Sequence, residues 1–171
     1  CPVTWVEAGE SLALGKRAYF ELPTGHRIEL YTDIELSENG PMIVNPDVWD
    51  VEPHGMGAIR FDHCLLYGPG VEDNVKLFCE VLDFELTEYA VNEEDYKMAV
   101  FLSCGNKAHD IAFVEYPEKD KFHHASFLLE SWHDVGHAAD IMSRYNISVD
   151  IGPTRHGITR GRTIYFFDPS G

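Results

Sequence analysis

The sequence lacks several features that would point to particular classes of protein. It has no run of roughly 18 consecutive apolar residues, the minimum for a membrane-spanning helix, and it does not open with a secretory signal. It is also poor in cations, with 13 Lys and Arg against 29 Asp and Glu and a formal net charge of −16. Nucleic acids need basic surface. We therefore expect a cytoplasmic protein with no membrane or nucleic-acid partner, acting on a small neutral or weakly acidic ligand.

Cysteine is scarce, and the two ends are unusual. The four cysteines show no CxxC or framework spacing, so we expect reduced thiols. Residue 1 is Cys rather than Met, and the chain stops in the turn 168–171, a kind of turn that normally leads into another strand. We expect both ends to be cut points within a longer protein.

Hydrophobic periodicity predicts an α+β protein with paired βαβββ modules, the second without its final strand. The unpatterned stretch 1–14 and a hairpin at 16–31 come first, and we assign 1–36 to the end of an earlier domain. The Pro- and Gly-rich stretch 37–58 is predicted as a linker, and 59–171 as a truncated second domain. The predicted elements of this domain are strand 59–67, helix 72–82, strands 84–91, 97–102, 108–116 and 122–129, helix 132–145, and strands 147–151 and 162–167.

An internal repeat supports the two modules. Residues 61–64 (FDHC) align with 122–125 (FHHA), and the two predicted helices then coincide. His63 and His124 therefore occupy equivalent positions, each on one face of the first strand of its module. Repeats on this scale determine the fold.

A second repeat aligns residues 15–25 with 161–171, and five of the eleven positions are identical. In the earlier copy the chain continues to Glu29, four residues beyond Gly25. We therefore expect a strand after Gly171 whose fourth residue is a candidate carboxylate.

These positions predict a metal centre. Two imidazoles and one carboxylate form the facial triad of non-haem Fe(II) oxygenases, which leaves open positions for substrate and oxygen. A single histidine on the apolar face of a strand, where we place His63, is usually a packed core residue. That alternative stays open for each histidine alone, but the equivalence of His63 and His124 favours ligands. Alternation along the strand places His123 on the opposite face.

Other histidines have weaker patterns. His109 begins the predicted strand 108–116, and His156 lies on a loop between Gly152 and Gly157. Either one is a candidate general base or hydrogen-bond donor, with a surface histidine as the alternative. Tyr165 is a candidate hydrogen-bond donor to a ligand or a packing residue. We expect no role in a site for His26 and His54. His133 and His137 are four residues apart on a predicted helix, a spacing that can hold a metal, but the apolar stripe lies elsewhere, so we expect both to face solvent.

Several motifs resemble those of a known family, the catechol 2,3-dioxygenases (metapyrocatechases), which are type I extradiol dioxygenases of the vicinal oxygen chelate superfamily. The matching stretches cover essentially the whole chain in order: YFELPTGHRIELY, RFDHCLLYG, KAHDIAFVEYPEK, FHHASFLLE and DIGPTRHGITRGRTIYFFDPSG.

The resemblance implies that 1–36 is the end of an N-terminal domain without metal and that 59–171 is a truncated C-terminal catalytic domain. It also implies extradiol cleavage of catechol or an alkylcatechol by O₂ to 2-hydroxymuconate semialdehyde, in a homotetramer. By this resemblance His63 and His124 match the histidine ligands of Fe(II), and a glutamate beyond Gly171 would be the third ligand. His109 matches the acid/base, His156 a hydrogen-bond donor to substrate or oxygen, and Tyr165 a contact to the catecholate. We expect the 171-residue chain alone to be inactive.

Two other functions remain open, because one fold supports many activities. The chain could be a glyoxalase-type metal enzyme or a metal-free small-molecule-binding protein of the same superfamily. A glyoxalase-like site would use more carboxylate or Gln ligands, whereas His109, His156 and Tyr165 favour the dioxygenase.

Overall fold

A computed structural model describes residues 2–35 and 55–171, so most of the predicted linker 37–58 lies outside the described residues. The described chain falls into two compact units. The first combines residues 2–35 with His63–Ala125, and the second combines residues 55–62 with Ser126–Gly171. The predicted division at residues 36 and 59 stays a prediction.

The first unit opens with a three-stranded antiparallel sheet. Its strands are β1 (Thr4–Val6), β2 (Arg17–Glu21) and β3 (Arg27–Tyr31), in that order across the sheet. The β2–β3 hairpin confirms the predicted one. Strand β1 lies in the stretch that we described as unpatterned. A strand of three residues is too short to show alternation, and its pairing with β2 is what identifies it.

The predicted βαβββ module follows in the expected order. It consists of β4 (Arg60–Gly68), α1 (Val71–Val81), β5 (Glu85–Val91), β6 (Lys97–Ser103) and β7 (Ile111–Glu115). With β8 (Lys121–Leu128) these strands form a five-stranded sheet in the order β5-β6-β7-β4-β8. Strand β4 lies parallel to β7, with Cys64 opposite Ile111. Strands β4 and β8, which carry His63 and His124, are therefore neighbours in this sheet.

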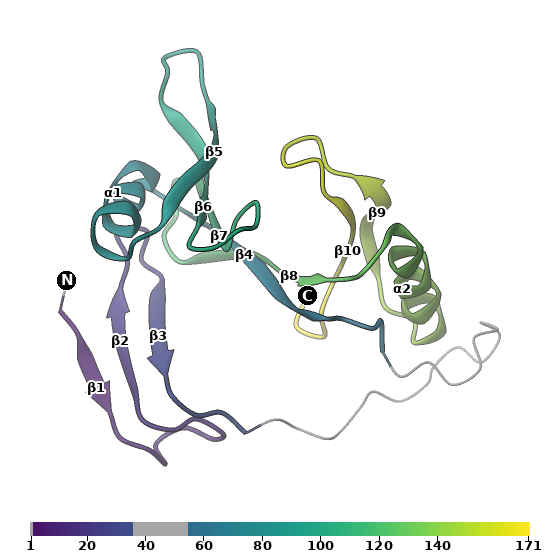
Figure 1. The fold of residues 1–171 in the computed structure, drawn as a ribbon, viewed down its shortest axis with the longest axis horizontal. Helices are drawn as coiled ribbons and strands as arrows, with labels where there is room; N and C mark the ends of the chain where they lie inside the picture. The colour runs from purple at the N-terminus through teal and green to yellow at the C-terminus, as the bar shows by residue number, and fades with distance from the viewer. Residues whose placement is uncertain (1, 36–54) are drawn as a thin grey trace. The chain divides into compact units, whose positions relative to one another are not determined.

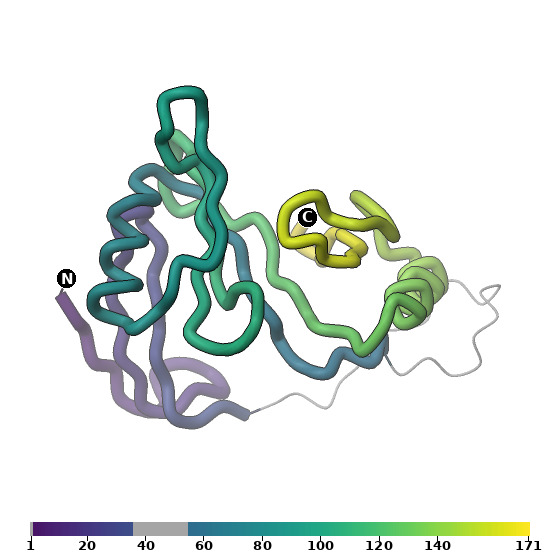
Figure 2. The backbone as a smooth tube through the Cα atoms, turned by 45° about the horizontal axis from the view of Figure 1, so that its top comes forward, coloured from purple at the N-terminus to yellow at the C-terminus, as the bar shows by residue number. Residues whose placement is uncertain are grey.

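The core of the first unit combines residues from the hairpin, the helix and the sheet. Fully or almost fully buried side chains include Leu22 after β2, Phe78 of α1 and Phe113 of β7. Figures 1 and 2 show α1 beside the β2–β3 hairpin in both views. The apolar face of α1 thus packs against residues that are far apart in the sequence, and this burial is the main stabilising term.

The two faces of β4 correct one expectation. His63 was placed on the more apolar face of this strand. In the structure Leu66 and Cys64, on the other face, pack against the core cluster, whereas Phe61 on the His63 face is 53% exposed. Both faces of β4 carry apolar residues, so alternation alone cannot tell which one covers the core. His63 is therefore a residue of the face turned away from that core.

The second unit holds the elements of the second module. Helix α2 (Trp132–Arg144) begins with a capping box between Ser131 and Asp134. Strands β9 (Val149–Arg155) and β10 (Arg162–Phe166) pair in an antiparallel hairpin. Strand β9 extends four residues beyond the predicted end at 151, through Gly152 and Pro153. Proline is tolerated here because β9 pairs on one side only, as the end of a two-stranded sheet.

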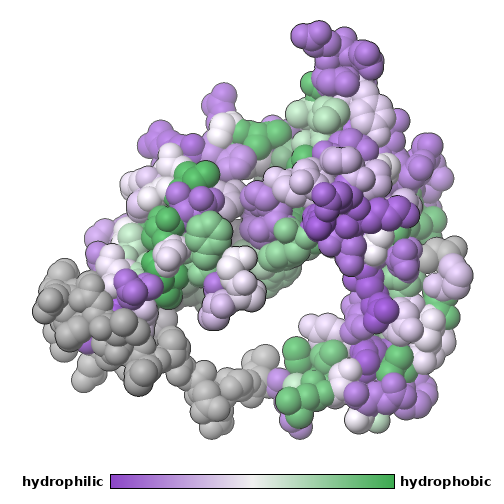
Figure 3. Space-filling view, turned by 180° about the vertical axis from the view of Figure 1, so that it is seen from behind, coloured by the Kyte–Doolittle hydropathy of each residue, from purple (hydrophilic) through white to green (hydrophobic). Residues whose placement is uncertain are grey.

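The surface of the described chain agrees with its composition. On the face shown in Figure 3 hydrophilic residues predominate, and apolar residues form separate groups. Neither α1, with 11 residues, nor α2, with 13, is long and apolar enough to cross a membrane, and no other helix of the described ranges is.

Candidate metal centre

Two histidine side chains converge between the neighbouring strands β4 and β8. The Nε2 atoms of His63 and His124 lie 3.2 Å apart, and their ring centroids lie 5.3 Å apart with the rings nearly perpendicular. Both belong to the first unit. The structure therefore brings together the two residues that the internal repeat paired.

This spacing fits a shared metal ion. A histidine nitrogen binds a divalent ion such as zinc at about 2.0–2.1 Å, so two nitrogens with perpendicular bonds to one ion lie about 3 Å apart. Among the residues that the structure describes, no group of three or more His, Cys, Asp or Glu side chains is arranged to hold a metal. The donor set is thus two nitrogens, which suits an ion that also takes oxygen ligands.

His109 lies against His63. Their ring centroids are 4.1 Å apart, and the ring of Phe101 lies 5.1 Å from that of His109 on another side. His109 is 7% exposed, and its Nδ1 atom is buried. The sequence placed His109 at the start of a strand, but β7 begins two residues later, at Ile111. His109 instead ends the loop that joins β6 to β7.

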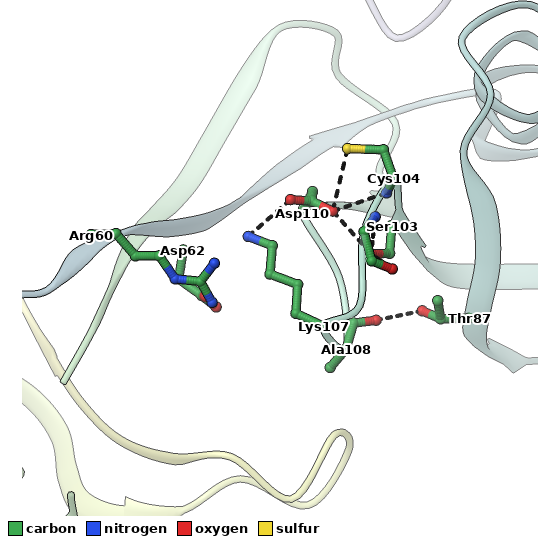
Figure 4. A network of polar contacts seen from close by, with 9 residues as sticks. Arg60, Asp62, Thr87, Ser103, Cys104, Lys107, Ala108 and Asp110 are labelled. Carbon is green, nitrogen blue, oxygen red and sulfur yellow. Dashed lines mark hydrogen bonds and ion pairs between the residues drawn. The ribbon is translucent and has the colours of Figure 1, made fainter. Parts of the chain in front are cut away.

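Asp110 holds that loop in place (Figure 4). Its Oδ2 atom accepts hydrogen bonds from Oγ of Ser103 and the backbone N–H of Cys104, both at 2.9 Å, and its Oδ1 atom lies 2.9 Å from Nζ of Lys107. On the other side of His109, Oγ1 of Thr87 donates to the carbonyl of Ala108 at 2.6 Å. The position of His109 is therefore fixed by the hydrogen bonds of the residues on either side of it, Ala108 and Asp110.

The ionisation of this loop follows from the same contacts. Desolvation acts to raise the pKa of Asp110, but the hydrogen bonds from Lys107, Cys104 and Ser103 and the charge of Lys107 together lower it below its usual value. The pKa of the Cys104 thiol is raised by desolvation and by the charge of Asp110. At neutral pH the loop thus holds a carboxylate and a protonated thiol, which is a poor nucleophile.

His123 differs from its predicted position. Alternation placed it on the face opposite His124, yet its Nδ1 atom lies 2.7 Å from Nδ1 of His124 and its ring lies 4.8 Å from that of Tyr67. Tyr67 shares a face of β4 with His63. Strand β8 is the last strand of its sheet, so no further strand confines the exposed His123 ring to the far face.

His156 and Tyr165 lie together in the second unit. Their ring centroids are 6.4 Å apart, and Nδ1–H of His156 donates to the carbonyl of Ile158 at 2.8 Å. In the neutral imidazole that bond places the proton on Nδ1 and leaves the lone pair on Nε2. His156 directly follows β9, and its backbone N–H donates to Gly161 at 2.6 Å, so it begins a closed turn rather than standing in the middle of an open loop.

Sequence reasoning missed two polar residues of the first unit. Asp110 was not singled out, although a charged residue directly after a candidate histidine was a usable signal. His26 was expected to lack a role, but it is 6% exposed, with Nδ1 3.0 Å from Oγ1 of Thr24 and Nε2–H donating to the carbonyl of Lys121 at 2.9 Å. No local pattern predicts that bond, because its partners are 95 residues apart. The predicted surface position of His133 is confirmed, since it is exposed on α2.

Comparison with known proteins gives relatives along the whole chain. The chain is 51% identical over 172 residues to the metapyrocatechase of Pseudomonas sp. (strain CF600), covering 100% of this chain and 56% of that protein. It is 27% identical to the manganese-dependent 2,3-dihydroxybiphenyl 1,2-dioxygenase of Geobacillus genomosp. 3, covering 98% and 55%. The chain thus spans little more than half the length of these relatives.

A solved structure agrees with the fold. The 2,3-dioxygenase LapB from Pseudomonas sp. KL28 superposes with a TM-score of 0.84 at 55% identity, over 99% of this chain and 60% of that one. The predicted α+β fold of the vicinal oxygen chelate type is confirmed.

Family models match both parts of the chain. Residues 1–35 match the catechol 2,3-dioxygenase-like N-terminal domain. Residues 60–171 match the model of the Glyoxalase/Bleomycin resistance protein/Dioxygenase superfamily, which covers more than half of the chain. The chain therefore belongs to the Glyoxalase/Bleomycin resistance protein/Dioxygenase superfamily.

Proposed function

We propose that this chain is the greater part of the catalytic machinery of an extradiol catechol dioxygenase. The observation that carries the proposal is the 3.2 Å approach of Nε2 of His63 to Nε2 of His124, with His109 stacked beside His63. The identity of 51% to a metapyrocatechase supports the same reaction, opening of the catechol ring by O₂ next to the two hydroxyls.

His63 and His124 would hold an Fe(II) ion through their Nε2 atoms. A bound Fe(II) would supply open positions for the catechol and O₂ and pass electrons from the catechol to O₂. A relative is manganese-dependent, so the identity of the ion belongs to the proposal. The third ligand would be a carboxylate on a strand after Gly171. In the earlier copy of the repeat Glu29 lies directly opposite Tyr19, the counterpart of Tyr165, on the neighbouring strand.

The remaining residues would act on protons and on orientation. His109 would take a proton from the catechol hydroxyl or return one to the ring-opening product through a ring nitrogen, since a buried imidazole near neutral pH can do either. His156, with Nδ1–H bound to Ile158, would use Nε2 as acceptor or, when protonated, as donor. The Tyr165 hydroxyl would donate a hydrogen bond to a catecholate oxygen.

The test uses the full-length protein, loaded with Fe(II) or with Mn(II) under anaerobic conditions and then mixed with catechol and air. We expect one ion to support a yellow product, 2-hydroxymuconate semialdehyde, followed by its visible absorbance. A colourless product of cleavage between the hydroxyls would refute the extradiol assignment. Light scattering of the same sample tests the proposed homotetramer.

Ligand variants make the test specific. His63→Ala and His124→Ala should each lose the bound metal, as measured by elemental analysis after gel filtration. His133→Ala, an exposed histidine of α2, is the matched control and should retain it. If metal is retained by both ligand variants, the site is elsewhere. A protein that binds metal at these residues but leaves catechols intact would instead favour a glyoxalase-type reaction, which the same family model includes.

A further inference from the structure

The side chain of the exposed His123 makes a contact that was not expected of an outward-facing strand residue. Its Nδ1 atom lies 2.7 Å from Nδ1 of His124, while Nε2 of His124 lies 3.2 Å from Nε2 of His63. Both ring nitrogens of His124 therefore have an imidazole partner. The partner of Nε2 is His63, at the candidate metal centre, and the partner of Nδ1 is His123.

We infer that His123 is a positioning residue, whose Nδ1 accepts the Nδ1–H of His124 and holds the bare Nε2 of His124 toward His63. This inference rests on the proposed metal site. A neutral imidazole carries one proton, and Nε2 must be bare to bind an ion. The proton of His124 then sits on Nδ1 and needs an acceptor. At 2.7 Å, Nδ1 of His123 supplies it, with the proton of His123 on Nε2.

Aromatic contacts keep the acceptor in place. The ring of Tyr67 meets that of His123 edge to face, with centroids 4.8 Å apart at 60°. Tyr67 in turn stacks on Tyr116, with centroids 5.4 Å apart and rings only 19° from parallel. The two tyrosines come from neighbouring parts of the sheet, at the ends of β4 and β7. The His123 ring is thus packed against the Tyr67–Tyr116 pair even though it is exposed to solvent.

Hydrogen-bond acceptors of the non-ligating N–H of a histidine ligand affect how tightly a site binds its metal. The group that accepts the other N–H of a ligating histidine fixes its tautomer and orientation, and its removal typically weakens metal binding by about 10- to 100-fold. The partner is usually a carboxylate, a carbonyl or water. Here the acceptor of the Nδ1–H of His124 is another imidazole, which is neutral and adds no negative charge to the site.

The test compares His123→Phe with His123→Asn in the full-length protein. Phe keeps a ring against Tyr67 but has no acceptor, whereas Oδ1 of Asn can stand where Nδ1 stood. We measure the dissociation constant for Co(II), a spectroscopic probe, by chelator competition, together with its visible absorption. His123→Phe should weaken binding about 10- to 100-fold and shift the absorption. His123→Asn should lie within about 3-fold of the parent. His133→Phe is the matched control for an exposed histidine.

The outcomes separate this inference from the proposal beneath it. Parent-like affinity in His123→Phe would overturn the positioning role. Equal weakening in the Phe and Asn variants would also overturn it, because an acceptor at this position would then restore no metal affinity. If His124→Ala binds Co(II) as the parent does, the proposed metal site itself fails. Thermal unfolding of the metal-free variants checks folding, and His123→Leu, a second variant without an acceptor, decides the question in the same way if the Phe variant is unstable.

Discussion

Asp110 uses each of its polar groups to hold the segment around His109. Its carboxylate contacts Ser103, Cys104 and Lys107, its backbone N–H donates to the carbonyl of Leu102 at 2.8 Å, and its own carbonyl accepts from the N–H of Cys64 at 3.3 Å. Cys64 directly follows His63. One residue therefore ties the loop that ends at His109 to the strand that carries His63.

We predict that Asp110→Asn lowers kcat about 10- to 100-fold, because a displacement of His109 by a fraction of an ångström is costly for proton transfer. Metal affinity should stay within about 2-fold, since the carboxylate contacts residues that are not proposed metal ligands, Ser103, Cys104 and Lys107. Steady-state kinetics and metal titration of the full-length protein measure both. Asp95→Asn, a change in an exposed turn, is the control and should leave kcat unchanged. Full kcat in Asp110→Asn would contradict the positioning role.

The same carboxylate predicts a pH dependence of stability. Desolvation opposes its ionisation, but hydrogen bonds and Lys107 lower the folded-state pKa below the unfolded value of about 3.8. An acid with a lowered folded pKa stabilises the fold above its unfolded pKa, and this contribution is lost as the pH falls through the folded pKa. The difference in free energy of unfolding between the parent and Asp110→Asn, from urea unfolding, should therefore be present at pH 6 and shrink below about pH 4. A difference that grows on acidification would contradict the assignment.

At the scale of elements, the start of α1 depends on a distant strand. The helix is preceded by Gly70, in the left-handed region with φ 82°, and Gly70 offers no side-chain cap. Glu115 at the end of β7 replaces it. Both of its carboxylate oxygens lie 3.1 Å from the N–H of Gly70, and Oε2 also accepts from Val71 at 3.2 Å and from the Tyr96 hydroxyl at 2.9 Å. A negative charge at this end of a helix also interacts favourably with the helix dipole.

We predict that Glu115→Ala lowers the free energy of unfolding by about 1–2 kcal/mol, the typical cost of losing an N-terminal cap with its charge. Hydrogen exchange should show the loss first in the amides of α1. Glu118→Ala is the matched control. It removes an exposed ion pair with Lys121 and should cost less than about 1 kcal/mol. Equal effects of the two substitutions would show that the cap does not stabilise the helix.

At the scale of the whole described chain, the first unit joins segments that the sequence assigned to different domains. Leu22 is 2% exposed and belongs to the same core cluster as Phe78 and Phe113, and Phe20 and Ile28 pack against that cluster. Thr24, 0% exposed, accepts a hydrogen bond from Asn74 of α1 at 3.1 Å. The hairpin is therefore part of the support of the module that carries His63.

We predict that Leu22→Ala costs about 2–5 kcal/mol, as for other fully buried leucines. The substitution should also reduce the hydrogen-exchange protection of α1, because the two share one core. Leu12→Ala, at a side chain that is 98% exposed, should change stability by less than about 0.5 kcal/mol. If Leu22→Ala leaves the protection of α1 unchanged, residues 1–36 fold independently of the module, as the predicted domain division implies.

The order of the elements and the pairing of the two central histidines could be predicted from the sequence. Both follow from local periodicity and from the repeat, which states that His63 and His124 are equivalent. The approach of their Nε2 atoms agrees with that prediction. His109 was singled out only as a candidate general base or hydrogen-bond donor. Its contact with His63 and its support by Asp110 were not foreseen, since both depend on how the loop folds back on itself.

The module architecture follows from local sequence patterns, because hydrophobic periodicity and turn residues act over a few neighbouring positions. Tertiary packing alone sets which face of β4 covers the core, which carboxylate caps α1, and which ring nitrogen lies against His124. These choices depend on groups that are 44 and 61 positions apart, as Val71 is from Glu115 and His63 is from His124. Burial and hydrogen bonding across such separations are properties of the packed chain, and no local pattern records them.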